Sequence, residues 1–374
     1  MVLARILLLA ATFFTTAASA DWITQSNANA MVVLHAQAQF QPEDVAQDGL
    51  TEYDGDVIDL KADYQARETA TDRELLAKLN RLLAQKQDPR VRQDLQIMIE
   101  SLQDNIESRR VTAALLLPYY NMHGFLFSSF NALLDPRNDS ARYASALERL
   151  RKYTGSQQGY TPITELARAR SLERFDVPGL LGPYREAMTK DLADAPRYIA
   201  GIRALFERAQ LQGWEDELTL LETQLAQYHA WLQSDLLPRA RTSNLLPREI
   251  YIDNLKNYGV RAEPEQLIRD GQYSYQLIRN EMKALARRIA EQRGWEDQSL
   301  LGVIHALKRE QIPSDQVLPL YQKRLAQIEE IIKRENIIAL PERDAAIRLA
   351  TEAESAAIPA PFMRRPQLIN NTGQ

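Results

Sequence analysis

Apolar residues recur three and four positions apart along most of this chain, and this spacing restricts its fold more than any other feature. One such run consists of Leu318, Tyr321, Leu325, Ile328 and Ile332, with charged residues between them. The spacing matches the period of an α-helix that buries one face. The alternating pattern of β-strands is nearly absent, and only 14 of the 374 residues are glycine. The sequence therefore predicts an all-α fold, built as an array of long antiparallel helices.

The first long helices are predicted to form an antiparallel hairpin. Leucines between Leu75 and Leu83 share one face after the cap-like pair Thr71-Asp72. A second run, from Val91 to Ile106, follows Asp88-Pro89, so we expect the turn just before that proline. Further helices are predicted at Ala141 to Tyr153, Pro183 to Gln212, Glu215 to Gln233, Pro264 to Gln292, Gln298 to Glu310, Ser314 to Glu335 and Glu342 to Ala357.

The first twenty residues have the pattern of a cleavable signal peptide. Arg5 precedes an apolar run from Ile6 to Phe14, and the small residues Ala18-Ser19-Ala20 suit a signal peptidase that cuts before Asp21. We expect cleavage after Ala20 and a periplasmic or secreted protein. The run is too short to span a membrane as a helix, and no later segment approaches the necessary length. The mature chain is then predicted as an N-terminal helical hairpin region, residues 21–110, that packs on a helical domain of residues 111–374.

Composition excludes several classes of protein. The chain contains no cysteine, so it cannot be a lipoprotein, a thiol enzyme or a zinc–thiolate protein, and it has no disulfide. Its formal net charge is −5 with both signs interspersed. Because there is no basic field, we expect it to bind neither nucleic acid nor an anionic membrane surface.

The C-terminal stretch carries a family resemblance. After the helical run, Pro359-Ala360-Pro361 and Arg365-Pro366 force the chain to leave the helix, because proline lacks a backbone donor. This order of residues, together with Leu246-Pro247-Arg248-Glu249-Ile250-Tyr251 and Tyr258-Gly259-Val260 upstream, resembles domain-of-unknown-function family 885, a large bacterial family of mostly exported proteins. The resemblance is clear over residues 180 to 374 and weaker before them.

The resemblance implies a metallopeptidase-like hydrolase in the complete family member. A His-Glu-x-x-His-like motif on a helix would bind zinc there, and its glutamate would polarise the attacking water. The histidines of this chain are His35, His123, His229 and His305, and none has that spacing or is followed by glutamate. The family's metal site therefore has no counterpart here. We assign no catalytic, cofactor-binding or metal-binding residue, and zinc is expected only in a complete member.

Two functions from different classes remain open. The chain is either the N-terminal portion of an exported zinc-dependent hydrolase, inactive alone, or a non-catalytic periplasmic helical protein that binds a peptide or a protein partner. We favour the first, because the chain ends at Asn370-Asn371-Thr372-Gly373-Gln374, inside the family-like motif rather than after a helix cap. Its partner is then a peptide substrate or a separate C-terminal part.

The segment from Leu115 to Leu134 is one place where a ligand site is conceivable. It gathers aromatic residues, among them Tyr119 and Tyr120, around His123, beside a proline and a glycine. An aromatic-walled pocket with one imidazole could hold a small ligand. The alternative, which we favour, is a buried pair of helices with a core histidine.

Carboxylate pairs give no clear site. Glu329 and Glu330 are adjacent and Glu352 and Glu354 are two apart, so neither pair shares a helix face, and solvation at the surface is the favoured role. The resemblance adds interest to Glu354 and to Asn371, because their segment precedes the missing motif and could line the cleft of the complete protein.

Overall fold

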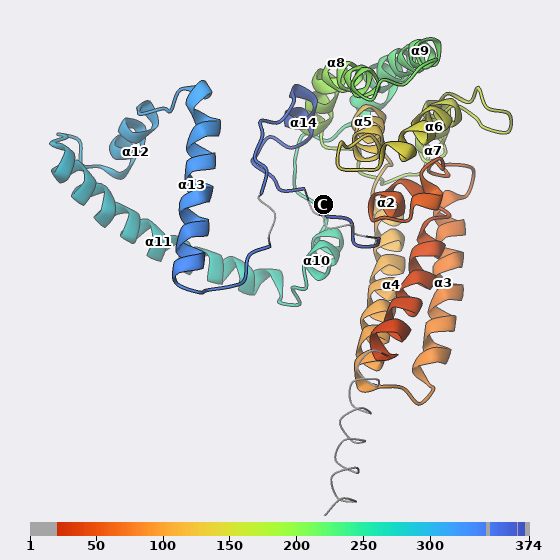
Figure 1. The fold of residues 1–374 in the computed structure, drawn as a ribbon, viewed down its shortest axis with the longest axis horizontal. Coiled ribbons are helices and arrows are strands. Elements are labelled where there is room, and N and C mark those ends of the chain that lie inside the picture. The colour runs from red at the N-terminus through yellow and green to blue at the C-terminus, as the bar shows by residue number, and fades with distance from the viewer. Residues whose placement is uncertain (1–20, 342–344, 365, 371–374) are drawn as a thin grey trace, which may run out of the picture. The chain divides into compact units, whose positions relative to one another are not determined.

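The computed structural model describes residues 21–341, 345–364 and 366–370, and it confirms an all-α protein (Figure 1). Residues 21–37 are helical. Among the described residues no strand is formed; Leu116 with Leu181 and Tyr184 with Arg241 make isolated backbone bridges. The later α-helices are α2 (Pro42–Gln47), α3 (Tyr64–Leu83), α4 (Pro89–Leu115), α5 (Met122–Leu133), α6 (Ala144–Thr154), α7 (Ile163–Leu172), α8 (Arg185–Arg208), α9 (Glu215–Trp231), α10 (Arg248–Asn257), α11 (Pro264–Arg293), α12 (Leu300–Arg309), α13 (Ser314–Arg334) and α14 (Glu352–Ala357). Short turns of other helix types are η1 (Thr51–Tyr53), η2 (Ser140–Tyr143), η3 (Leu232–Leu236) and η4 (Leu237–Arg239).

The chain divides into two compact units. The described residues up to Gly259, together with those from Glu352 onward, form the first unit, and Val260–Thr351 form the second. The second unit is thus inserted into the sequence of the first. The boundary at residue 110 that the sequence suggested stays a prediction.

The hairpin of α3 and α4 is confirmed, and the two helices lie side by side (Figure 1). Asp88 caps α4, since its carboxylate accepts a hydrogen bond from the backbone N–H of Arg90. Leu79, Val91 and Leu95 are fully buried between the helices, and residues 21–37 add Trp22, Val32, Val33 and Ala36 to this cluster. The helix α3 begins at Tyr64, earlier than the cap-like Thr71-Asp72 suggested, because the ring of Tyr64 is buried against Phe40 at 5.8 Å between centroids.

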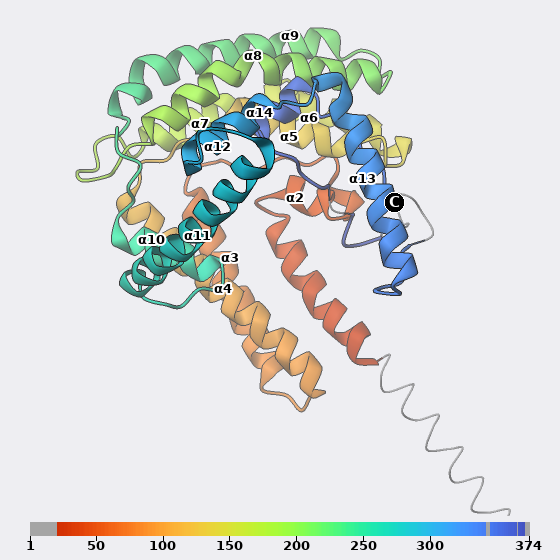
Figure 2. The same cartoon turned by 90° about the vertical axis from the view of Figure 1, so that its left-hand side faces the viewer.

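The main core of the first unit lies among α5 to α9. Figure 2 shows α8 and α9 running side by side, and α5 contacts α8 while α6 and α7 contact α9. Phe130 of α5 is fully buried and makes edge contacts with Tyr153 and Phe206 at 5.7 and 5.1 Å between ring centroids. Burial of one such aromatic side chain contributes about 1.5–3 kcal/mol relative to its exposed state. These helices form the packed base on which α14 and other segments of the first unit lie.

The helix α14 joins this core through a close approach to α8. A Cβ atom added at Gly201 of α8 would lie 2.5 Å from Cβ of Ala353, so only glycine allows this contact. The prediction of a helix from Glu342 to Ala357 is only partly right: α14 begins at Glu352, residues 345–351 are not helical, and residues 342–344 lie outside the described residues. The reason is tertiary. Ala353 and Ala356 are buried in the core, whereas residues 345–351 are mostly exposed, and a short helix without packing is marginal in water.

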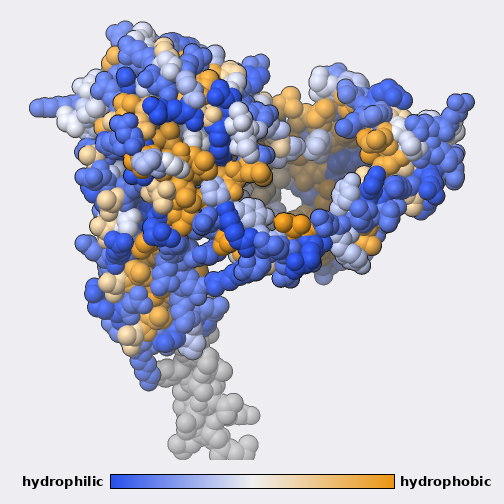
Figure 3. Space-filling model, turned by 180° about the vertical axis from the view of Figure 1, so that it is seen from behind, coloured by the Kyte–Doolittle hydropathy of each residue, from blue (hydrophilic) through white to orange (hydrophobic). Residues whose placement is uncertain are grey.

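The second unit has a small core of its own. Ala286 and Ala290 of α11 pack on Val303 of α12, with Ile289, Trp295 and Leu300 around them. The helix α13 has no buried residue. Apolar side chains accordingly reach the surface of this unit (Figure 3), and those on α11 and α13 include Ile268, Tyr275, Ile278, Met282, Leu285, Tyr321, Ile328 and Ile331. No helix within the described ranges is long and apolar enough to cross a membrane.

Candidate functional site

A cavity of about 500 Å³ opens in the first unit where the end of α5 meets α14 and the segment that follows it. We call this segment the strap, and it comprises the described residues 358–364 and 366–370. Its wall combines apolar and polar side chains: Gln47, Phe127, Ser128, Asn131, Ala132, Asp135, Arg137, Asn138, Glu354, Ala357, Ile358, Phe362, Met363, Arg364, Pro366 and Gln367. The site thus joins helices of the core to a C-terminal segment more than 200 residues away in sequence.

The turn after α5 fixes the position of Asp135. Its carboxylate accepts hydrogen bonds from the backbone N–H of Arg137 and from the guanidinium of the same residue, each at 3.0 Å. Its carbonyl oxygen accepts a hydrogen bond from the Tyr143 hydroxyl at 3.0 Å. Asn138 closes the end of α5, since its side-chain amide donates to the carbonyl oxygens of Ala132 and Leu133 at 2.8 and 2.9 Å. Asp135 is therefore held in place by its own turn.

The far end of the strap is anchored at α2. The backbone N–H of Ile369 donates to the carbonyl of Asp48 at 2.9 Å, and the Asn370 amide donates to the carbonyl of Gly49 at 3.2 Å. Gly49 has a φ of +115°, and a Cβ there would lie 2.1 Å from the Ile369 carbonyl oxygen. Between this anchor and α14, Gln367 donates to the Asn138 side-chain oxygen at 3.2 Å.

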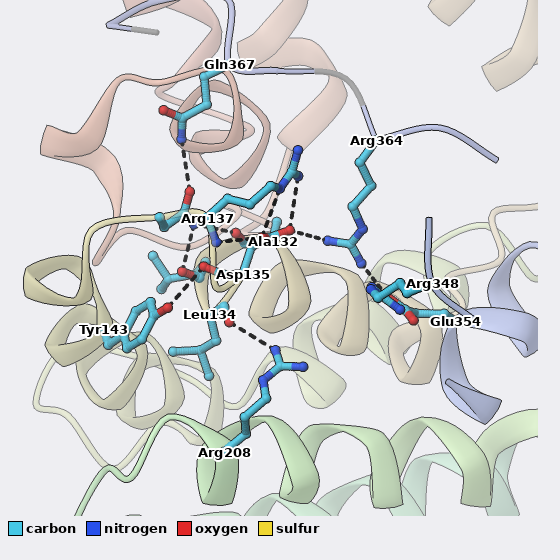
Figure 4. Close-up of polar contacts among 12 residues, drawn as sticks. Ala132, Leu134, Asp135, Arg137, Tyr143, Arg208, Arg348, Glu354, Arg364 and Gln367 are labelled. Atoms are coloured by element: carbon cyan, nitrogen blue, oxygen red, sulfur yellow. Dashed lines mark hydrogen bonds and ion pairs between the residues drawn. The ribbon is translucent and has the colours of Figure 1, made fainter. Parts of the chain in front are cut away.

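Arg364 of the strap lies between two buried carboxylates (Figure 4). Its Nη1 is 2.6 Å from Oδ2 of Asp135 and its Nη2 is 2.5 Å from Oε1 of Glu354. The side chains of Asp135 and Glu354 are only 8% and 4% exposed, and that of Arg364 is 24% exposed. Burial alone would raise the pKa of Asp135, but hydrogen bonds from Arg137 and the charge of Arg364 outweigh it and hold this pKa below its usual range. Two buried carboxylates therefore hold the guanidinium of Arg364 at the wall of the cavity, and Arg137 also pairs with Asp135.

Among the sequence candidates that the structure describes, Glu354 alone lines this cavity. The favoured surface role for Glu354 is wrong, because α14 places its side chain in the core while the neighbouring Glu352 is exposed. Burial of a carboxylate is tolerated here because an arginine pairs with it. Asn371 lies outside the described residues.

The aromatic candidates lie elsewhere in the first unit and do not line the cavity. The Tyr119 hydroxyl donates to Asp191 of α8 at 3.0 Å, and the carbonyl of Tyr120 accepts from the Tyr228 hydroxyl at 2.9 Å. Each of these tyrosines is only partly exposed. They connect the start of α5 to α8 and α9.

His123 is a core residue that faces a second histidine. It is 2% exposed, and its ring centroid lies 5.7 Å from that of His229 of α9 in an edge arrangement. Burial, with a smaller contribution from the charge of His229, lowers the pKa of His123 to about 4, although a hydrogen bond with the backbone of Leu225 acts in the opposite direction. The separation of 106 positions between the two histidines gave no sequence signal for this pair.

The described residues do not fit the zinc ion that the family resemblance implies. Within the described ranges, no three side chains of histidine, cysteine, aspartate or glutamate converge as metal ligands. His123 and His229 form a pair, but among the described residues no third potential metal ligand joins them. His123 also makes a hydrogen bond with the backbone of Leu225. We therefore derive no step that involves a metal.

Sequence reasoning missed Asp135, Arg137 and Arg364. Asp135-Pro136-Arg137 reads as an ordinary turn, and Arg364 stands in a proline-rich tail without periodicity. The only available signal was the ending of α5 before a proline, which places polar side chains at a helix terminus.

Comparison with family models gives a match over residues 42–374, which covers most of the chain. The matching family is described as "Bacterial protein of unknown function (DUF885)". A search of curated proteins finds no match.

Proposed function

Because this chain belongs to the DUF885 family of bacterial proteins, we propose that it is the helical, peptide-binding part of an exported, zinc-dependent peptidase-like hydrolase. In this proposal the chain leaves the cell interior through a signal peptide that is cleaved after Ala20. The 374 residues alone bind peptide and do not cleave it, because the metal-binding motif that hydrolysis would need is not among them.

The observation that supports this proposal most is the cavity at the end of α5. Its volume of about 500 Å³ lies in the range of ligand sites, which is about 300–1,000 Å³. Its wall offers apolar side chains such as Phe127 and Ile358, amides such as Asn131, and charges of both signs. A peptide has the same mixture of groups, with backbone donors and acceptors between apolar and charged side chains.

The experiment measures peptide binding to the purified chain by fluorescence anisotropy with a labelled peptide mixture. We expect Ala132→Trp, which fills the cavity, to weaken binding about tenfold or more. Ser128→Tyr fills it from an exposed position on α5 and serves as a second variant if the first unfolds. The matched control is Ala326→Trp, at an exposed position on α13.

The proposal fails if the chain with its native circular dichroism spectrum binds no peptide, or if Ala132→Trp and Ser128→Tyr both fold and bind peptide as the wild type does. Mass spectrometry of the same peptides tests the other part of the proposal, that the chain alone does not cleave peptides. Intact peptides are expected after long incubation with and without added zinc, and cleavage that a chelator abolishes would overturn it.

The alternative, a non-catalytic protein that binds a protein partner, is supported by a different observation. The helix α13 carries the apolar residues Leu318, Tyr321, Leu325 and Ile328 along one face, yet none of them is buried. A partner that covered this face would gain about 1.5–3 kcal/mol of binding free energy for each apolar side chain that it fully buries. Protection of the α13 amides from hydrogen exchange is the measurement that would favour this alternative.

A further inference from the structure

We propose that the position between Asp135 and Glu354, at the wall of the cavity at the end of α5, is a subsite for an arginine side chain of a bound peptide, and that Arg364 of the strap occupies it in the resting protein. This inference rests on the proposed peptide-binding function. It adds that the bound peptide contains arginine and that the chain's own Arg364 competes with it. It predicts that the strap must release Arg364 before a ligand enters.

The two carboxylates that contact Arg364 do not depend on it for their position. Asp135 is held in its turn by hydrogen bonds with Arg137 and Tyr143. Glu354 is held by α14, because Ala353 and Ala356 of the same helix are buried in the core. Both carboxylates therefore stay in place when the strap moves. A preorganised pair of acceptors binds a cation with less reorganisation than a flexible surface pair.

The strap lies on the first unit as a bound peptide would. Its described residues near Arg364 form no helix, and the two residues before Arg364, Phe362 and Met363, are exposed. The guanidinium of Arg364 points toward the two buried carboxylates (Figure 4). An extended peptide likewise places one side chain in a specificity pocket while neighbouring side chains stay exposed. The anchor at Ile369 and Asn370 tethers the strap independently of Arg364.

The geometry selects arginine over lysine. Two different nitrogens of the same guanidinium contact two carboxylates, at 2.6 and 2.5 Å. The planar guanidinium presents donors at fixed directions and can bridge two acceptors, whereas an ammonium is a compact, strongly hydrated charge. A ligand with an uncharged citrulline in place of arginine would bring the same shape without the charge that the two carboxylates require.

The tethered Arg364 is expected to weaken binding of a free ligand. A group on a short tether competes at an effective concentration of roughly 1 mM or more. If the Arg364 side chain binds the subsite with an intrinsic Kd of about 0.1 mM, a free ligand would bind roughly tenfold more weakly to the wild type than to a variant without this side chain.

The test measures binding of acetyl-alanyl-arginine amide to the full chain by isothermal titration calorimetry. We expect Arg364→Ala to bind this probe about tenfold more tightly than the wild type, and to discriminate against the citrulline analogue. The double variant Arg364→Ala with Asp135→Asn is expected to lose the gain. Arg334→Ala removes an exposed arginine from α13 and should behave as the wild type.

A second readout covers the case in which Arg364→Ala folds poorly. The arginine probe is then expected to raise the melting temperature of this variant in a saturable way, whereas the citrulline probe does not. The inference is overturned if the folded variant binds the two probes equally, or if neither affinity nor melting temperature responds to the arginine probe. A third outcome separates the two proposals. If Arg364→Ala binds the arginine probe, but neither the wild type nor the variant binds any peptide longer than this probe, the subsite stands and the proposed peptide-binding function fails.

Discussion

At the scale of single residues, His123 shows how burial makes a side chain sensitive to pH. Its pKa is lowered to about 4 from an unperturbed value of about 6.5. Above about pH 6.5 the ring is neutral in both the folded and the unfolded chain and contributes no pH dependence. As the pH falls from about 6.5 toward 4, the unfolded chain binds a proton that the folded protein does not. The free energy of unfolding therefore decreases by about 3 kcal/mol over this window.

Replacement of His123 by glutamine should remove this dependence. Between about pH 7 and pH 4, we expect the free energy of unfolding of the wild type to fall by about 3 kcal/mol more than that of His123→Gln. Urea unfolding followed by circular dichroism measures it. The control is His35→Gln, at an exposed histidine. Parallel curves for wild type and His123→Gln over this window would refute the assignment.

Residue by residue, the sequence predicted chemistry only where its cause is local. The start of α4 was predicted from Asp88-Pro89 because this signal is local, and the cap itself joins Asp88 to a backbone N–H only two residues away. The contact of Arg364 with Asp135 joins positions 229 apart, and that of His123 with His229 joins different helices. No pattern within one segment encodes such pairs, because the tertiary fold creates them.

At the scale of elements, helical periodicity predicted α8, α9, α11, α12 and α13 to within a few residues of their ends. It failed at α14, where an alanine-rich run extends past the buried part. The same periodicity shows which face of a helix is apolar, but it does not show which other element packs against that face. The cavity was therefore out of reach, since it forms between α5 and a strap without periodicity.

The contact of α8 with α14 gives a prediction at this scale. Gly201→Ala is expected to displace α14, because overpacking costs about 1–3 kcal/mol and exceeds the gain of about 1 kcal/mol in helix propensity. The amide of Ile358, which donates to the Glu354 carbonyl at 2.8 Å, should exchange with deuterium severalfold faster. Gly271→Ala in α11 is the matched control, because a Cβ there meets no atom within 4 Å, and it should stabilise its helix. Equal exchange of Ile358 in wild type and Gly201→Ala would contradict the role of this contact.

At the scale of the whole molecule, the two units differ in the size of their cores. The core of the first unit contains large aromatic residues such as Phe130, Phe206 and Trp214, whereas that of the second consists of Ala286, Ala290 and Val303 with partly buried neighbours. Stability follows the apolar area removed from water, so the second unit should open at a lower free energy. A single melting temperature then does not describe the protein.

Val303→Ala tests this difference, because Val303 is one of the few buried side chains of the second unit. We expect the variant to raise the exchange rates of amides in α11 and α12 by about tenfold and to leave those of α5 and α8 unchanged, since the loss of a buried methyl pair costs on the order of 1–2 kcal/mol within one unit. Hydrogen exchange read by mass spectrometry resolves these helices. In the reciprocal variant, Leu126→Ala in the core of the first unit, α5 and α8 should respond instead. If Val303→Ala accelerates exchange equally in all four helices, the chain unfolds as one cooperative body and the two-unit description is wrong.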